Sequence, residues 1–453
     1  MRFTPSCRHK GLVRLLVFAS VAGLVSMASA ASRPPLYADL ADRARAQPPE
    51  FAADALLRIA DAPGVTDVAW KREMLEDAFH LAAAAQQPYA RRNWTGKPAG
   101  PFDKAYAQGL DVCTLQCRAV HAMLAVDYKK ARELFGEMPP LQFPRLSCDD
   151  DLVYDPSIFY ETAGEVAARA FGAKEVAAGE PFHLLLRYAA DVTSPVQVAP
   201  VARMLAGVSL KPAQFEALVH SFAAALTQLS GDDRSFSATD SRDADAALFG
   251  LPAECVHRKT NAQPLVEAWR AYIARQLGGK RCANPEAATA SSKAGQCGSA
   301  QCAQLATQFN GLIMAPSGFG FTPEQKGTSE YRARLRQYLE ALADWTDDDD
   351  PVEFFRFKTA FYSELFSLTP NGPDRDLLLT TLLGWLQQNG YQRDHPAEWF
   401  YAVNTLIVHA FADPAGMHAT VRALRNSSDP VIALFSELER LLPRPREEAW
   451  NTL

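Results

Sequence analysis

Apolar residues recur along most of this chain at the spacing of an α-helix. Four segments place their apolar residues on one helical face: 51–59, 70–82, 218–229 and 265–277. No stretch shows a sustained alternation of apolar and polar residues, and no Asn-Gly or Asp-Gly pair joins two β-branched runs. The pattern predicts an all-α fold of stacked helical hairpins in two regions, either α-solenoid-like or an irregular helical array.

Prolines mark the positions where helices are expected to begin. A capping Asp or Ser precedes proline at five places: Asp155-Pro156, Ser194-Pro195, Asp350-Pro351, Asp413-Pro414 and Asp429-Pro430. Proline fits the first helical position because its missing N–H has no partner there. The preceding side chain accepts hydrogen bonds from the next free N–H groups.

The expected helix starts in the C-terminal third are regularly spaced. They are Pro351, Pro373, Pro396, Pro414 and Pro430. They lie 16 to 23 residues apart, so helix pairs recur every 34 to 45 residues, a period typical of helical-hairpin repeats. One segment of about 14 residues, 126–139, resembles the second helix of a tetratricopeptide or pentatricopeptide unit. It recurs nowhere else in the chain, so it implies a packed hairpin and carries no family function.

Two polar stretches divide the chain. Residues 283–300 are rich in Ala, Ser and Gly and poor in large apolar residues, which is typical of a linker or long loop. A second polar break lies at 230–245. We therefore expect four parts: a signal peptide at 1–30, an N-terminal helical domain at 34–281, a linker or long loop at 282–300, and a C-terminal helical domain at 301–450.

The first 30 residues have the pattern of a secretory signal. Four basic residues and no acidic ones accompany an apolar run that ends in Ala28-Ser29-Ala30, so cleavage is expected between Ala30 and Ala31. Removing this leader changes the net charge from −6 to −10. We predict a periplasmic or secreted protein without a membrane span after cleavage. Its acidity argues against a nucleic-acid partner, because phosphates would be repelled.

Export permits disulfides, and seven of the eight cysteines follow the leader. We predict two bonds: Cys255 with Cys282, across an expected helix at 264–277, and Cys297 with Cys302, across a flexible stretch. Cys113, Cys117 and His121 follow each other at four-residue intervals and suggest a metal site. However, such positions climb about 12 Å along one helix, too far for all three to reach one ion. Buried thiols on a packed helix face are the favoured interpretation.

The sequence contains none of the common short catalytic or nucleotide-binding motifs that we sought. Two carboxylate–histidine pairs, Glu76 with His80 and Glu216 with His220, are spaced to share a helix face. They could ligate a metal or tune a general base, but surface pairs are favoured. The acidic runs 149–151 and 347–350 could bind Ca²⁺, yet they lack the ligand spacing of a calcium loop. We predict no catalytic, cofactor-binding or metal residue, and no cofactor.

One segment stands out for its aromatic residues. Phe354, Phe355, Phe357, Phe361 and Tyr362 fall within a single expected helix and cover a broad face of it. A helix buried on most sides explains this composition best. The alternative is an aromatic groove for a peptide, glycan or hydrophobic ligand.

These features favour an exported, non-enzymatic scaffold or binding protein that engages a protein or peptide partner through a helical-array surface. The alternative is a hydrolase or lyase that acts on polysaccharide or cell wall from a helical scaffold. That alternative would require two carboxyl groups about 5–10 Å apart in a cleft. The sequence predicts neither the identity of the partner nor the oligomeric state.

Overall fold

The computed structural model confirms the all-α fold. It describes residues 33–85, 90–92, 109–141, 143, 150–152, 155–233, 236, 241–279, 299–313, 323–326, 328–346, 351–370, 372–390, 396–412 and 418–443. In the N-terminal part the helices are α1 (Pro35–Arg45), α2 (Pro49–Ala60), α3 (Val68–Ala83), α4 (Val112–Val126), α5 (Tyr128–Glu137), α6 (Ser157–Arg169), α7 (Ala173–Ala178), α8 (Glu180–Ala190), the 3₁₀ turn η2 (Pro195–Gln197), α9 (Val198–Gly207), α10 (Pro212–Gln228), α11 (Ser241–His257) and α12 (Gln263–Gly278).

The C-terminal part continues the same architecture. Its helices are α14 (Ala300–Ile313), α15 (Pro323–Lys326), α16 (Ser329–Asp344), α17 (Pro351–Leu368), α18 (Pro373–Gln388), α19 (Pro396–Ala412), α20 (His418–Arg425) and α21 (Pro430–Leu441). Four of them begin at the prolines that the sequence predicts. Before α21, for example, Asp429 Oδ1 accepts hydrogen bonds from the N–H groups of Val431 (2.9 Å) and Ile432 (3.0 Å). Residues 413–417, including the predicted start at Pro414, lie outside the described residues.

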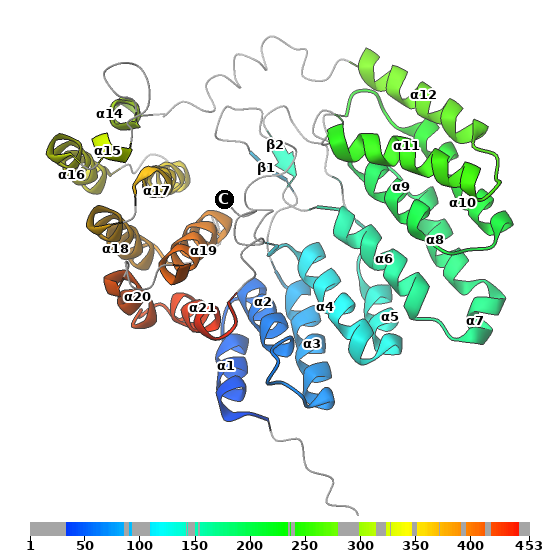
Figure 1. Ribbon diagram of the computed structural model, residues 1–453, viewed down its shortest axis with the longest axis horizontal. Helices are drawn as coiled ribbons and strands as arrows, with labels where there is room; N and C mark the ends of the chain where they lie inside the picture. Colours follow the sequence, from blue (N-terminus) through cyan, green and yellow to red (C-terminus); the bar gives the residue numbers. More distant parts are fainter. Residues whose placement is uncertain are drawn as a thin grey trace, which may run out of the picture.

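The helices form two layers along an arc (Figure 1). In the N-terminal part α2, α4, α6 and α9 lie on the inner side, with α5, α7, α8 and α10 outside them. In the C-terminal part α17, α19 and α21 lie inside α16, α18 and α20. The order around the arc is α14 to α21 followed by α1 to α12, so the first and last helices of the chain meet in the middle of the array.

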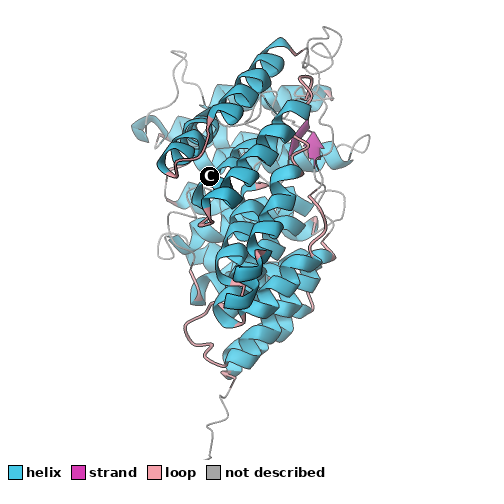
Figure 2. Ribbon diagram, turned by 90° about the vertical axis from the view of Figure 1, so that its right-hand side faces the viewer, coloured by secondary structure: helices cyan, strands magenta, loops and turns pink. Residues whose placement is uncertain are grey.

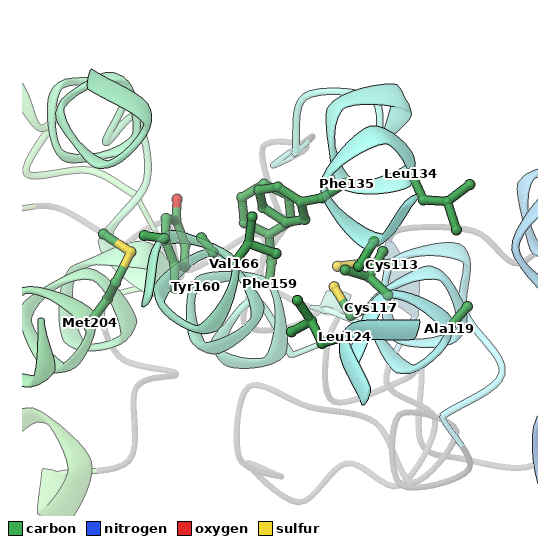
Figure 3. Close-up of a cluster of buried hydrophobic side chains, with 14 of the residues drawn as sticks. Cys113, Cys117, Ala119, Leu124, Leu134, Phe135, Phe159, Tyr160, Val166 and Met204 are labelled. Atoms are coloured by element: carbon green, nitrogen blue, oxygen red, sulfur yellow. The ribbon is translucent and has the colours of Figure 1, made fainter. Parts of the chain in front are cut away.

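Two hydrophobic cores hold the array together. The N-terminal core is built from α1 to α12, and Figure 3 shows part of it where α4, α5, α6 and α9 meet, including Cys113, Cys117 and Phe135. The C-terminal core is built mainly from α14 to α21. The predicted boundaries near 281 and 300 flank residues 280–298, which lie outside the described residues, so the division into domains remains a prediction.

The two cores exchange residues where the terminal helices meet. Phe51 of α2 belongs to the C-terminal core, with its ring centroid 4.7 Å from that of Phe400 and 6.1 Å from that of Phe435. In return, Leu434 and Leu438 of α21 belong to the N-terminal core. This reciprocal packing makes the two regions one continuous array, which the sequence does not reveal.

A short antiparallel strand pair accompanies the helices. Strands β1 (Ala90–Arg92) and β2 (Asp150–Leu152) place Arg91 opposite Asp151 and Arg92 opposite Asp150. In the side view of Figure 2 the pair lies at one edge of the molecule. The strands escape sequence analysis because three residues are too few for a recognisable alternation. Two residues of the acidic run 149–151, Asp150 and Asp151, lie in strand β2, whereas the run 347–350 lies outside the described residues.

Candidate functional site: an inner ladder of polar contacts

Side chains on the inner layer connect each helix to the next. The contacts join Arg58 of α2 to Glu439 of α21 (3.1 Å), Arg118 of α4 to Asp54 of α2 (2.6 Å), His121 of α4 to Glu165 of α6 (2.6 Å), Arg203 of α9 to Ser157 of α6 (2.8 Å), and Arg258 of α11 to the carbonyl oxygen of Ala206 in α9 (3.2 Å). We call this set of residues the inner ladder. It runs from α21 to α11 and crosses the junction between the two cores.

Helical spacing explains how single helices contribute to two contacts. Asp54 and Arg58 are four residues apart on α2, and Arg118 and His121 are three apart on α4. Residues at these spacings share one face of a helix. The apolar residues between them, such as Ala55 and Leu56, turn into the buried core. One face of each inner helix therefore packs into the hydrophobic core, and another face carries the polar side chains that bond to the neighbouring helices.

The ladder is buried at the junction, is most exposed in its middle between α4 and α6, and is less exposed again at α11, where the Arg258 side chain is 17% exposed. The side chains of Arg58 and Glu439 are 9% and 7% exposed, whereas those of His121 and Glu165 are 61% and 38% exposed. A buried ion pair fixes geometry, because removing one partner is costly. An exposed hydrogen bond can exchange its partner at little cost. The buried end of the ladder at the junction is therefore suited to holding the array, and its exposed middle to contacting another molecule.

The carboxylates of the ladder are bonded to nitrogen donors. Asp54 lies 2.6 Å from the Arg118 guanidinium, and Glu165 lies 2.6 Å from Nδ1 of His121. Within the part of the chain that the structure describes, no group of three or more His, Cys, Asp or Glu side chains is placed to hold a metal ion. The ladder offers charged and hydrogen-bonding groups along a surface.

Asp111 is a buried carboxyl group outside the ladder. Its Oδ1 accepts a hydrogen bond from the N–H of Thr114 (2.8 Å) and so caps α4, while Oδ2 has no hydrogen-bond partner among the described residues. Burial raises the pKa of Asp111 to about 6. In the sequence, Asp111 directly precedes an apolar helical run, and this arrangement is typical of the start of a helix. We assign it to the folding of α4.

The aromatic residues of α17 pack in or against the C-terminal core. Phe355 and Tyr362 are buried, and Phe354, Phe357 and Phe361 are half-buried against the same core. This arrangement is the one expected for a helix covered on most sides. The structure places these five side chains on more than one side of α17, and they do not meet the inner ladder.

Lys358 lies among these rings as a buried cation. Its Nζ donates to the carbonyl oxygens of Trp345 (2.8 Å) and Ala343 (3.1 Å) at the end of α16, and it lies 4.6 Å from the centroid of the Trp385 ring. Burial lowers the pKa of Lys358 to about 8. Lysine near a helix C-terminus satisfies carbonyl groups that have no partner within the helix. This lysine therefore ties α17 to the end of α16.

The structure separates the cysteines into two kinds. Cys113 and Cys117 are free and buried in the N-terminal core, while His121 is exposed and bonded to Glu165, so the three do not form a site. Cys255 is a free, buried thiol whose side chain interacts with Thr260, and the predicted Cys255–Cys282 disulfide is therefore not present. The thiol of Cys255 is buried because this face of α11 packs against a neighbouring helix, and its burial requires no disulfide.

Cys302 differs from these three residues because it is disulfide-bonded. Its partner lies outside the described residues, since the other described cysteines are free. Cys282 and Cys297 are both in that part of the chain, so the Cys297–Cys302 pairing remains a prediction. The cleavage site at Ala30 and Ala31 also lies outside the described residues.

Glu76 and His80, the two residues on α3 that are spaced to share a helix face, each contact other residues. Glu76 lies 2.8 Å from Arg72 and 3.7 Å from Lys130, and the ring of His80 packs beside that of Phe79. The ladder, in contrast, was missed by sequence reasoning. The available signal was the pair of charged residues, Asp54 and Arg58, at helical spacing within the otherwise apolar segment of α2.

Comparison with protein-family models, with characterised proteins and with solved structures gave no match. Among the helices that the structure describes, none combines the length and the apolar character needed to cross a membrane.

Proposed function

We propose that this protein is exported and acts as a non-enzymatic scaffold or binding protein. A protein or peptide partner would lie along the inner side of the arc and contact the exposed middle of the inner ladder, at His121 and Glu165. The observation that carries this proposal is the ladder itself: polar contacts continue from helix to helix on the inner layer and become exposed at His121 and Glu165. Stacked helices provide extended curved surfaces of this kind.

Two further features support the proposal. The disulfide at Cys302 fits an exported protein, because such bonds persist in oxidising compartments. The ladder carboxylates Asp54 and Glu165 are engaged with Arg118 and His121, an arrangement better suited to positioning charge than to the two-carboxyl chemistry of a glycosidase. The disulfide supports export, and the engaged carboxylates favour binding over the hydrolase alternative.

Site-specific photo-cross-linking in the native host tests this proposal. A photoreactive side chain replaces His121 on the inner ladder, and in a matched control it replaces Val176 on the outer helix α7, where the residue is 52% exposed. We expect a protein or peptide adduct of one defined mass from position 121 and none from position 176. Only position 121 should give an adduct, because the partner would contact the inner side of the arc and not the outer helix α7.

Three results would count against the proposal. They are no adduct from position 121, equal adducts from both positions, or an adduct whose added mass is carbohydrate. The last result would instead support the polysaccharide alternative. Normal expression and helical content of both variants would establish that a missing adduct does not result from misfolding.

A further inference from the structure

A hollow of about 510 Å³ lies on the outer layer, between α18 and α20. Its lining is Asp376 from α18, four residues of α20 (His418, Ala419, Arg422 and Ala423), and Asn426, which directly follows α20. Both helices belong to the outer layer of the arc, so this surface is separate from the inner ladder (Figure 1). The volume lies within the range of sites that bind small molecules.

The lining separates its two charged groups. His418 and Arg422 are four residues apart and share one face of α20. Asn426 continues this face, because its N–H donates to the carbonyl oxygen of Arg422 (3.1 Å) in the turn that follows the helix. Asp376 is fixed from the other helix: Thr420 donates to its carboxylate through both the hydroxyl group and the backbone N–H, the latter at 3.3 Å. Thr420 is completely buried, so this carboxylate has a fixed position. Small side chains, Ala419 and Ala423, separate the polar groups.

Among the residues that the structure describes, the donors that line the hollow have no competing partners. Within the described part of the chain, the side chains of His418, Arg422 and Asn426 make no hydrogen bond, ion pair or cation–π contact. The guanidinium is free to bind a carboxylate in two-point geometry. A ligand with only negative charge would be repelled by Asp376, and one with only positive charge by Arg422. Charge complementarity selects a ligand that carries both.

We propose that this hollow binds a small zwitterion of the amino-acid or short-peptide class. The ligand carboxylate pairs with Arg422, with Asn426 as a further donor, and the ligand ammonium group pairs with Asp376. The apolar patch of Ala419 and Ala423 lies against the part of the ligand between its charges. This site lies outside the inner ladder, and it does not depend on the function proposed above.

Titration with trialanine tests this assignment in the full-length mature protein at low ionic strength, by calorimetry or NMR. We expect saturable millimolar binding, weakened about tenfold by Arg422→Gln, because the variant loses a charge-assisted pair. The matched control is Arg425→Gln, an exposed arginine on the same helix that does not line the hollow, which should stay within about twofold of the wild type.

Blocked peptides identify which end of the ligand meets which residue. Amidating the C-terminus of trialanine should weaken binding to the wild type about tenfold and should have little further effect on Arg422→Gln, because both changes remove the same pair. Acetylating the N-terminus should behave in the same way with Asp376→Asn. The proposal is overturned by the absence of saturable binding, by equal losses in Arg422→Gln and Arg425→Gln, or by additive losses from amidation and Arg422→Gln.

Discussion

Replacing Phe51 with Ala should destabilise the whole protein by about 3–5 kcal/mol, the usual cost of removing a fully buried phenylalanine. Phe51 has no solvent exposure and packs against rings of α19 and α21, so the variant leaves a cavity where the two cores meet. Denaturant unfolding, followed by circular dichroism, measures the change in the free energy of unfolding.

Phe249→Ala is the matched control for this prediction. The same substitution is made on α11, where the phenylalanine is 73% exposed, and it should change the free energy of unfolding by less than about 0.5 kcal/mol. Losses of similar size in the two variants would show that Phe51 has no special place in the junction. A loss confined to the N-terminal helices would also contradict the account, since Phe51 packs in the C-terminal core.

Replacing Arg58 with Met should cost about 3 kcal/mol, the second largest effect that we expect. The substitution keeps an unbranched apolar stem but removes the guanidinium group, and with it the ion pair with Glu439 and the hydrogen bond to the carbonyl oxygen of Leu442 (2.9 Å). Both contacts hold α21 against α2. The free energy of unfolding and the rate of hydrogen exchange in α21 should both report the loss.

Arg43 provides a control at the same junction. It pairs with Glu437 of α21 at 2.8 Å, but its side chain is 39% exposed. Because solvent screens such a pair, Arg43→Met should cost no more than about 1 kcal/mol. Equal losses of stability in Arg58→Met and Arg43→Met would contradict this account. They would show that burial of the Arg58–Glu439 pair does not determine the strength of the junction.

Local structure could be predicted here because its causes are local. The Asp429-Pro430 pair predicts the start of α21, since the proline conformation and the hydrogen bonds from Asp429 involve only the next few residues. The starts at Pro351, Pro373 and Pro396 follow from the same local preference. The all-α fold follows from apolar spacing within single segments.

The arrangement of these helices could not be predicted in this way. Phe51 meets Phe435 across 384 positions of sequence, and no pattern near either residue identifies the other. The inner ladder has the same property, because Asp54 and Arg118 are ordinary surface-type residues until α2 and α4 pack side by side. The predicted Cys255–Cys282 bond relied on proximity in sequence, and burial of Cys255 as a free thiol shows why that was insufficient.

The two regions form one array, because α21 packs against α1 and α2, and they are not joined merely by the chain between α12 and α14. A continuous inner surface, and thus the proposed binding function, depends on this junction. Whether this junction alone holds the two regions together can be tested by inserting a protease site between residues 283 and 296 and cutting the folded protein.

Size-exclusion chromatography of the cut protein, under reducing conditions, gives the most direct answer. We predict that the two pieces stay together and elute as the intact protein does, because Phe51, Leu434 and the Arg58–Glu439 pair remain in place. The cut Phe51→Ala variant should separate at lower denaturant concentration. Elution of the cut wild-type protein as two independent folded pieces would contradict the account.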